Sequence, residues 1–445
     1  MNEVTVIGGG LAGCEAAWAL AEKGLNVRLT EMKPKKFTPA HHYKGLAELV
    51  CSNSLKAVRT GSACGMLKAE MRMLGSLILQ AADHAAVPAG GALAVNREKF
   101  SDFITDKIYE HPKITLVCEE ATEFPKKNTI IATGPLTAGK IAAAIEKQCG
   151  SPLSFYDAAA PIVTADSIDM GKAFFATRYD KGDADYINCP MNKEQYEKFY
   201  DALIKAETVP LKEFEACIGK EGTNNEGKCE KIPVYEGCMP VEVLAKRGAE
   251  SVRYGCMKPV GLIDPNTGHR PWAAVQLRKE NLEGSSYNLV GFQTNLRFPE
   301  QQRVFRMIPG LENAEFIRYG VMHRNTFLNS PKLLDDRFML KNSDNIFFAG
   351  QMTGVEGYVE SAMSGIIAGQ SMARRLRGEE KIHLPLTSMC GALCRYIRTE
   401  NDNFQPMGAN MGILPPLENE IRNKQERYER MAERGLRELE ETLNK

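Results

Sequence analysis

The pattern of apolar and polar positions at the start of the chain predicts a strand, a helix and a second strand. Residues 3–8 and 26–31 are apolar runs, and residues 11–23 carry apolar side chains at helical spacing before Gly24. A glycine at that place is typical of a helix C-terminus. Strand, helix and strand in this order form a βαβ unit, which predicts an α/β fold.

The same pattern returns near the end of the chain. After a long loop at 33–63, apolar positions predict helices over 66–86, 98–110 and 358–376 and strands over 114–118, 129–133 and 345–349. Short strands and turns fill about 166–317. We therefore expect a discontinuous Rossmann-like domain with an inserted smaller α+β domain. The predicted segments are 1–165 for the first part, 166–317 for the insertion, and 318–445 for the second part with an amphipathic helix at 418–445.

Composition narrows the class of protein. A chain of 445 residues should form two or three domains, and 56 basic against 56 acidic residues give no global attraction to nucleic acid. RNA contact would need a local basic patch. The chain shows no secretion signal and no apolar run of about 20 residues, so we expect a cytoplasmic protein without a membrane span.

The twelve cysteines indicate reduced thiols because they lack the paired spacing of a disulfide framework. Cys390 and Cys394 have helical spacing, but no second Cys or His pair completes a zinc site, so we expect no metal. For any single cysteine the ordinary interpretation is a small buried hydrophobe, and Cys14 is expected to be one.

A glycine-rich loop joins the first strand to the first helix and satisfies the pattern G-x-G-x-x-G. Glycines there permit a tight turn and let the backbone approach a pyrophosphate at the helix N-terminus. Glu31 ends the second strand 18 residues after Gly13, where a carboxylate accepts a hydrogen bond from a ribose hydroxyl. The loop alone fits NAD or FAD. Its predicted cofactor-binding residues are Gly8, Gly9, Gly10, Leu11, Ala12 and Gly13.

Two later segments favour FAD. Residues 130–134 and 347–351 resemble the inner strands of two-part flavoproteins, and the second segment is followed by a glycine-rich turn and a helix. A helix that begins near Tyr358 can direct its positive end at the flavin. The additional cofactor-binding residues predicted by these segments are Gly134, Gly350, Gln351 and Gly357.

Several segments, in order, resemble one family over nearly the whole chain. They are residues 8–13, 39–42, 48–54, 87–94, 237–242, 257–262, 321–326 and 350–357. The family is the folate- and FAD-dependent tRNA (uracil-5-)-methyltransferases. The last segment is also similar to the tRNA-modification flavoproteins of the glucose-inhibited-division type, which are longer. Residues 56–64 and 220–231 depart from the family pattern.

The resemblance implies transfer of a one-carbon unit from 5,10-methylenetetrahydrofolate to the T-loop uridine of tRNA, conventionally number 54. Reduced FAD would give the hydride, NAD(P)H would regenerate it, and S-adenosylmethionine would not be needed. By resemblance, Cys238 is the nucleophile that adds to uracil C6, Cys51 is the second functional cysteine beside the flavin, and His323 packs against the folate pterin. A thiolate suits addition at C6, which makes C5 nucleophilic.

Three other functions stay open from the sequence. The first is the same chemistry on a uridine of 23S ribosomal RNA. The second is an NAD(P)H-dependent flavin oxidoreductase that does not act on RNA, and the third is a non-enzymatic RNA-binding factor stabilised by FAD. His41 and His42 have no assigned role. Two basic clusters are interpreted as solvated faces, with RNA contact as the alternative: Lys33, Lys35 and Lys36, and Arg374, Arg375 and Arg377.

Overall fold

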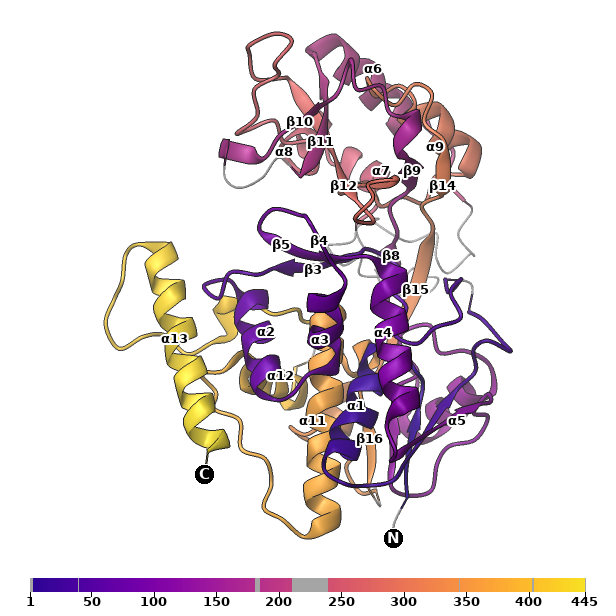
Figure 1. Ribbon diagram of the computed structural model, residues 1–445, viewed down its shortest axis with the longest axis vertical. Coiled ribbons are helices and arrows are strands. Elements are labelled where there is room, and N and C mark those ends of the chain that lie inside the picture. Colours follow the sequence, from indigo (N-terminus) through magenta and orange to yellow (C-terminus); the bar gives the residue numbers. More distant parts are fainter. Residues whose placement is uncertain are drawn as a thin grey trace, which may run out of the picture.

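A five-stranded parallel sheet forms the centre of the lower part of the molecule (Figure 1). The computed structural model describes residues 3–38, 40–180, 185–209, 239–343, 345–401 and 404–444, and the side chains of 155–157, 180, 323 and 324 lie outside this description. The strand order is β16-β7-β1-β2-β6, and every pairing is parallel. The strands are β1 (Val4–Ile7), β2 (Val27–Glu31), β6 (Ile114–Cys118), β7 (Thr129–Ile131) and β16 (Ile346–Phe348). The predicted parallel α/β fold is therefore confirmed, and β16 joins the sheet from the second half of the chain.

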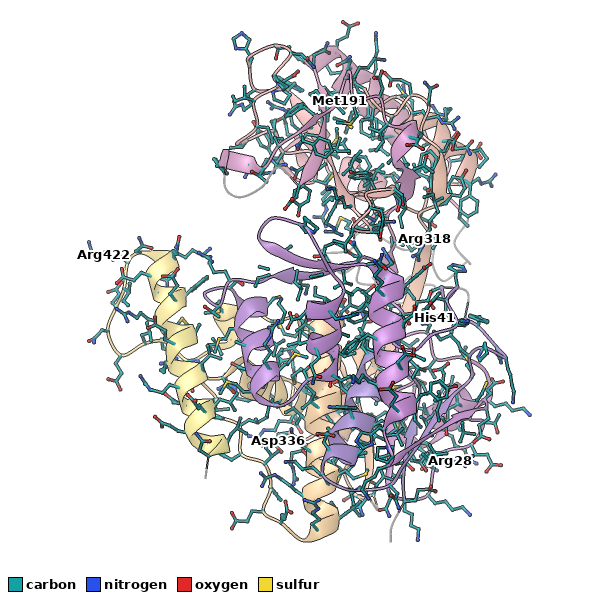
Figure 2. The ribbon with its side chains drawn as sticks, viewed as in Figure 1. Arg28, His41, Met191, Arg318, Asp336 and Arg422 are labelled. Carbon is teal, nitrogen blue, oxygen red and sulfur yellow. The ribbon has the colours of Figure 1, made fainter. Side chains whose placement is uncertain are left out.

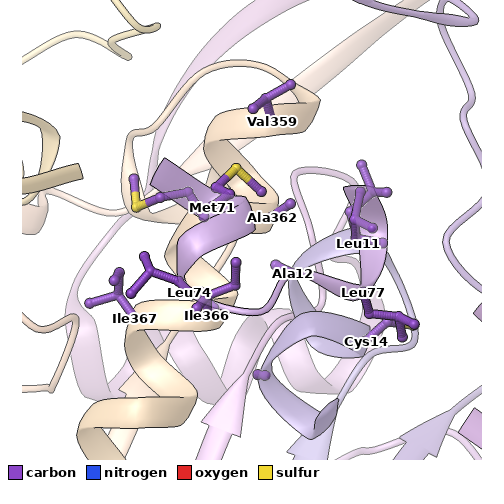
Figure 3. Close-up of a cluster of buried hydrophobic side chains, with 14 of the residues drawn as sticks. Leu11, Ala12, Cys14, Met71, Leu74, Leu77, Val359, Ala362, Ile366 and Ile367 are labelled. Carbon is purple, nitrogen blue, oxygen red and sulfur yellow. The ribbon is translucent and has the colours of Figure 1, made fainter. Parts of the chain in front are cut away.

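Two helices from opposite ends of the chain pack tightly on this sheet (Figure 3). These are α1 (Leu11–Glu22) and α11 (Tyr358–Arg377). A Cβ atom at Gly365 would lie 2.1 Å from the Ala12 carbonyl oxygen, so this helix contact depends on the missing side chain. Since Gly365 is the eighth residue of α11 and Ala12 is the second residue of α1, the first turns of α11 extend past the N-terminus of α1.

The predicted helix over 66–86 is wrong in one respect, because the structure has two helices there, α2 (Ala63–Met73) and α3 (Leu77–His84). Gly75 has φ of +82°, a conformation that ends a helix and that glycine adopts without strain. The Ser76 side chain then accepts a hydrogen bond from Leu79 N–H and caps α3. The long loop predicted at 33–63 also contains a short strand, β3 (Ser54–Ala57), which pairs with β5 (Ala92–Val95).

The remaining elements of the lower part surround this core. The C-terminal helix α13 (Lys424–Leu443) packs its buried face against α2 and begins six residues later than the amphipathic helix predicted from residue 418. The elements are β4 (Ala86–Val87), β5 (Ala92–Val95), α4 (Arg97–Glu110), α5 (Gly139–Cys149), α10 (Ser330–Leu333), α12 (Met389–Arg398) and α13 (Lys424–Leu443).

A six-stranded antiparallel sheet with its own hydrophobic core forms the upper part (Figure 1). Its order is β10-β11-β12-β13-β9-β14, and the antiparallel pair β8–β15 runs between the two parts. The division at residues 165/166 and 317/318 stays a prediction. The strands are β8 (Leu153–Ala158), β9 (Ile162–Thr164), β10 (Phe174–Phe175), β11 (Tyr186–Met191), β12 (Ala273–Lys279), β13 (Ser286–Leu289), β14 (Phe316–Arg318) and β15 (Met322–Phe327). The helices are α6 (Lys193–Lys205), α7 (Val241–Ala245), α8 (Ala249–Tyr254) and α9 (Phe298–Phe305).

Candidate functional site

The glycine-rich loop between β1 and α1 is shaped by close backbone contacts. Gly8 has φ of +104°, and a Cβ atom there would lie 2.4 Å from the Ala132 carbonyl oxygen. A Cβ atom at Gly13 would lie 1.8 Å from the Gly8 carbonyl oxygen, whereas one at Gly10 would meet nothing within 4 Å. Gly8 and Gly13 are therefore required by the turn itself, and Gly10 keeps a space open in front of the helix N-terminus.

Glu31 connects this loop to the end of β2. Gly9 N–H donates a hydrogen bond of 2.6 Å to Glu31 Oε2, and Lys33 N–H donates one of 2.8 Å to Oε1. Each carboxylate oxygen accepts more than one hydrogen bond, so these contacts leave capacity for a ligand hydroxyl. The backbone bonds fix the carboxylate at the place where the sequence predicts a ribose contact.

A cavity of about 910 Å³ opens in front of the loop. Its walls bring together both halves of the chain, and an adjacent cavity of about 830 Å³ shares Glu31 and Thr38 with it. These volumes include space open to solvent. Two adjoining cavities lined by a glycine-rich loop suit an extended ligand. The predicted residues on the larger cavity wall are Gly8, Gly9, Gly10, Leu11, Ala12, Glu31, Gly134, Gly350 and Gln351, and Gly13 and Gly357 are not among its lining residues.

The N-terminus of α11 opens onto the same cavity. Gly350 and Gly357 have φ of +87° and +113°, a backbone conformation that glycine adopts without strain and that a residue with a side chain rarely adopts. Gln351 Nε2 donates to the Glu356 carboxylate, which holds the turn together. Tyr358 and Ser361, in the first turn of α11, line the cavity. The N–H groups and the positive dipole end of α11 therefore favour an anionic ligand group at this place.

Cys51 lies beside this helix start. Its backbone N–H donates a hydrogen bond of 2.7 Å to the Tyr358 hydroxyl oxygen, which also accepts one of 3.2 Å from Ser52 N–H. The Cys51 thiol lies 3.7 Å from the Ala158 carbonyl oxygen. Burial raises the pKa of Tyr358, so its hydroxyl is neutral at pH 7. Cys51 thus stands next to the cavity wall on a backbone tied to α11.

Three arginines that the sequence reasoning missed hold the segment around Cys51. Arg97 donates to the carbonyl oxygens of residues 49 and 51, and Arg318 donates to that of residue 50. Arg278 bonds the side chains of Ser52 and Asn53 at 2.8 and 3.0 Å. Arg318 lies where the two parts of the molecule meet (Figure 2). These arginines are far from Cys51 in sequence and belong to no motif, so no local signal could identify them.

Two predicted site residues lie outside the described structure. Cys238 falls in the segment 210–238, and the side chain of His323 is also undescribed. The backbone of His323 belongs to β15, where it is paired with Asp157 of β8. Their roles stay predictions. Cys14 is buried against the Gly9 carbonyl oxygen, which confirms it as a packing residue.

The basic cluster expected at Lys33, Lys35 and Lys36 is wrong for Lys33. Its side chain is buried, and its ammonium bonds the Gly45 carbonyl oxygen at 2.6 Å and the Glu48 carboxylate at 3.3 Å. Burial, together with the charge of Lys33, lowers the pKa of His41, which hydrogen-bonds Thr38 and lines the cavity. Lys33 therefore supports the cavity wall and is not part of a solvated face or an RNA surface.

The arginines at the end of α11 lie far from the cavity. Arg374 is sixteen residues beyond Tyr358, which corresponds to about 24 Å along a helix. Arg377 forms an ion pair with Glu379 at 3.3 Å. This exposed cluster is at the opposite end of α11 from the candidate site (Figure 1).

Within the described ranges, the side chains form no group of three or more His, Cys, Asp and Glu residues that could hold a metal ion. Among the same residues, no helix is both long and apolar enough to cross a membrane.

The fold and the site define a class, the α/β proteins that bind a dinucleotide at a glycine-rich loop. A family model described as glucose inhibited division protein A matches residues 3–380. In solved structures, GidA of Aquifex aeolicus superposes with a TM-score of 0.69 and 16% identity, covering 99% of this chain and 73% of that one. This likeness supports the fold.

Relatives with much higher identity give the family. The proteins from Acetivibrio thermocellus and Heliobacterium modesticaldum are 54% and 56% identical, covering 100% and 98% of this chain and 99% and 97% of their own length. The protein from Geobacter sulfurreducens is 55% identical over 99% of this chain and 98% of its own. All three are named methylenetetrahydrofolate–tRNA-(uracil-5-)-methyltransferase TrmFO. The chain belongs to this methyltransferase family.

Proposed function

We propose that this protein methylates C5 of a uridine in tRNA, at T-loop position 54, with 5,10-methylenetetrahydrofolate as carbon donor and FAD as cofactor. The observation that carries the proposal is the place of Cys51, beside a dinucleotide cavity in a chain of this methyltransferase family. Formation of a methyl group from a methylene unit needs a hydride, and FAD reduced by NAD(P)H supplies it.

The residues of the cavity fit FAD. The glycine loop leaves room at Gly10 for a pyrophosphate, and the N–H groups at the start of α1 face that space. The Glu31 carboxylate accepts a hydrogen bond from a ribose hydroxyl, and the adjacent cavity extends the binding space beyond Glu31. At the other end, the N-terminus of α11 favours negative charge on a flavin ring. These features hold the two ends and the middle of an extended dinucleotide.

The thiols are assigned to the two steps that uracil requires. Cys238 adds as a thiolate to C6, and the resulting enolate attacks the methylene carbon of the folate donor through C5. Loss of the C5 proton then expels tetrahydrofolate and leaves an exocyclic methylene group on C5. A hydride, which reduced FAD would supply, converts this group to the methyl, and elimination of Cys238 from C6 restores the ring. Cys51 is assigned to accept that proton or to carry the methylene carbon, because its backbone is fixed beside the cavity. His323 is assigned to pack against the folate pterin.

The target is proposed as tRNA because the three relatives above carry that substrate in their names. No contact in the described residues favours 23S ribosomal RNA, an oxidoreductase that does not act on RNA, or a non-enzymatic RNA-binding factor. A tRNA-modifying enzyme works where tRNA is found, so a cytoplasmic location is part of the proposal.

A competition assay tests the target. The purified yellow protein, NAD(P)H and labelled 5,10-methylenetetrahydrofolate are incubated with an unmodified tRNA transcript and a 23S ribosomal RNA fragment together. Label in T-loop 5-methyluridine of the tRNA supports the proposal. Label only in the ribosomal fragment changes the target, and NAD(P)H oxidation without labelled RNA in any condition contradicts the methyltransferase function.

A further inference from the structure

The backbone that carries Cys51 is held by two guanidinium groups. Arg97 donates to the carbonyl oxygens of Leu49 and Cys51, the latter at 3.3 Å, and Arg318 donates to that of Val50. Three consecutive peptide carbonyls therefore point at fixed cations. Since Tyr358 accepts the Cys51 N–H, the peptide groups on both sides of this residue are tied. The direction of the Cys51 side chain is consequently set by side chains from three other elements.

The place of Arg97, buried at a helix N-terminus, costs free energy for a cation. Arg97 is the first residue of α4, where the helix dipole repels a cation. Its side chain is only 16% exposed, and a buried cation is costly without a partner. Glu280, which follows β12, offsets this cost, because its carboxylate contacts Arg97 Nε at 2.7 Å and Nη2 at 3.4 Å. The pair leaves two N–H groups of Arg97 directed at the Cys51 segment.

The charged groups around Cys51 are unequal in number. Arg97, Arg278 and Arg318 are cations, and Glu280 is the carboxylate that pairs with Arg97, while Tyr358 is neutral. Guanidinium groups stay charged at every pH at which a protein is folded. In a partly buried site the excess positive charge favours the charged form of a neighbouring thiol.

We propose that Arg97, held by Glu280, is a positioning residue for Cys51: it orients the Cys51 backbone and favours the thiolate. The catalytic importance of this arrangement rests on the proposed function, but the effect of Arg97 on the thiol does not. Arg97 acts through Cys51 and is not assigned any contact with the RNA, the folate or the flavin.

The chain offers a matched control for this pair. Lys99 and Glu283 connect the same two segments, α4 and the turn after β12, by an ion pair of 3.4 Å. Their side chains are 50% and 61% exposed, so the pair contributes little to stability. Loss of the Lys99–Glu283 pair removes one ion pair between α4 and the turn after β12 and changes no contact of the Cys51 segment.

The test measures alkylation of Cys51 by iodoacetamide in the yellow holoprotein, resolved from the other cysteines by peptide mass spectrometry, from pH 6 to 9. The variants are Arg97→Gln with Glu280→Gln, Arg97→Lys, and Lys99→Gln. The double variant removes both charges, so no unpaired carboxylate stays buried. Melting of each variant, followed by flavin absorbance, shows that the folded holoprotein is compared.

We expect the double variant to react about tenfold more slowly at pH 7, with the midpoint of its pH profile moved upward. Arg97→Lys keeps the charge and should restore most of the midpoint, and Lys99→Gln should match the wild type. An unchanged profile in the double variant, or an equal shift in Lys99→Gln, would overturn the proposal. A shifted profile with undiminished RNA labelling would support the action of Arg97 on Cys51 and contradict the role of Cys51 in the proposed function.

Discussion

Gly9 and Glu31 are joined by a hydrogen bond of 2.6 Å from the backbone N–H of Gly9 to Glu31 Oε2. The bond connects the glycine loop to the end of β2, the two places that a dinucleotide must contact at the same time. A carboxylate that both shapes the loop and faces the ligand should be more sensitive to substitution than one that serves either purpose alone.

Replacement of this carboxylate should weaken cofactor binding. In Glu31→Gln the charge-assisted bonds to Gly9 and to the ribose are lost, which costs roughly 1.5–3 kcal/mol. Flavin affinity should therefore fall at least about tenfold in a fluorescence titration of the apoprotein. Glu22→Gln is the control, because Glu22 is an exposed acid whose ion pair within the described residues is with His111. Equal flavin affinity in Glu31→Gln and wild type would remove Glu31 from the site.

Two glycines of the loop should respond differently to alanine. Gly13→Ala places a Cβ atom 1.8 Å from the Gly8 carbonyl oxygen, so both the melting temperature of the apoprotein and flavin binding should fall. Gly10→Ala meets no protein atom within 4 Å and should leave the apoprotein stable, while the methyl group occupies the space proposed for the pyrophosphate. A Gly10→Ala protein that binds FAD with unchanged affinity would contradict the proposed cofactor position.

Loss of the Tyr358 hydroxyl should affect Cys51 more than the fold. In Tyr358→Phe the N–H groups of Cys51 and Ser52 lose their acceptor, at a cost of about 1–3 kcal/mol. We expect the flavin to be retained and the rate of RNA labelling to fall at least tenfold. Tyr109→Phe, at a tyrosine that is 67% exposed, is the control. Full labelling activity in Tyr358→Phe would show that the tie to α11 does not orient Cys51.

Two buried carboxylates should make stability depend on pH. Burial raises the pKa of Glu15 and of Glu70 to about 7, although each accepts N–H groups at the start of another helix. The folded state therefore binds more protons than the unfolded state between about pH 4.5 and 7. The contribution of each group to stability is present below the unfolded pKa and is lost as pH rises through the folded one.

Thermal melting at pH 5.5 and pH 8 measures this effect. For a chain of this length a loss of 1 kcal/mol lowers the melting temperature by roughly 1 °C. The melting temperature should be higher at pH 5.5 than at pH 8. Glu15→Gln should reduce this difference in melting temperature, whereas Glu110→Gln, at an exposed acid, should leave it unchanged. A difference that Glu15→Gln leaves unchanged would show that Glu15 does not titrate in this range.

The start of the fold could be predicted from the sequence because its determinants are local. The ends of β1, α1 and β2 were all predicted to within one residue, since apolar periodicity and Gly24 define them directly. The break between α2 and α3 was missed because apolar residues keep their helical spacing on both sides of Gly75 and Ser76, although the helix itself ends there. Periodicity reports which side faces the core, and it does not report that the axis changes direction.

The surroundings of Cys51 could not be predicted, because they depend on contacts between distant residues. Tyr358 and Arg97 reach Cys51 across 307 and 46 positions. Lys33 was misplaced for the same reason. A lysine in a basic run is expected at the surface, and its carbonyl and carboxylate partners are known only from the folded chain. The motifs located the cofactor loop, and only the folded chain shows what fixes the thiol.

The carbon source of the methyl group tests the central claim most directly. Unmodified tRNA is treated with the holoprotein, NAD(P)H, 5,10-methylenetetrahydrofolate carrying ¹³C in its methylene group, and unlabelled S-adenosylmethionine, and the nucleosides are analysed by mass spectrometry. The account predicts 5-methyluridine from position 54 with the heavy carbon, at the same yield when S-adenosylmethionine is omitted. Product with only light carbon, or product that forms only when S-adenosylmethionine is present, would contradict it.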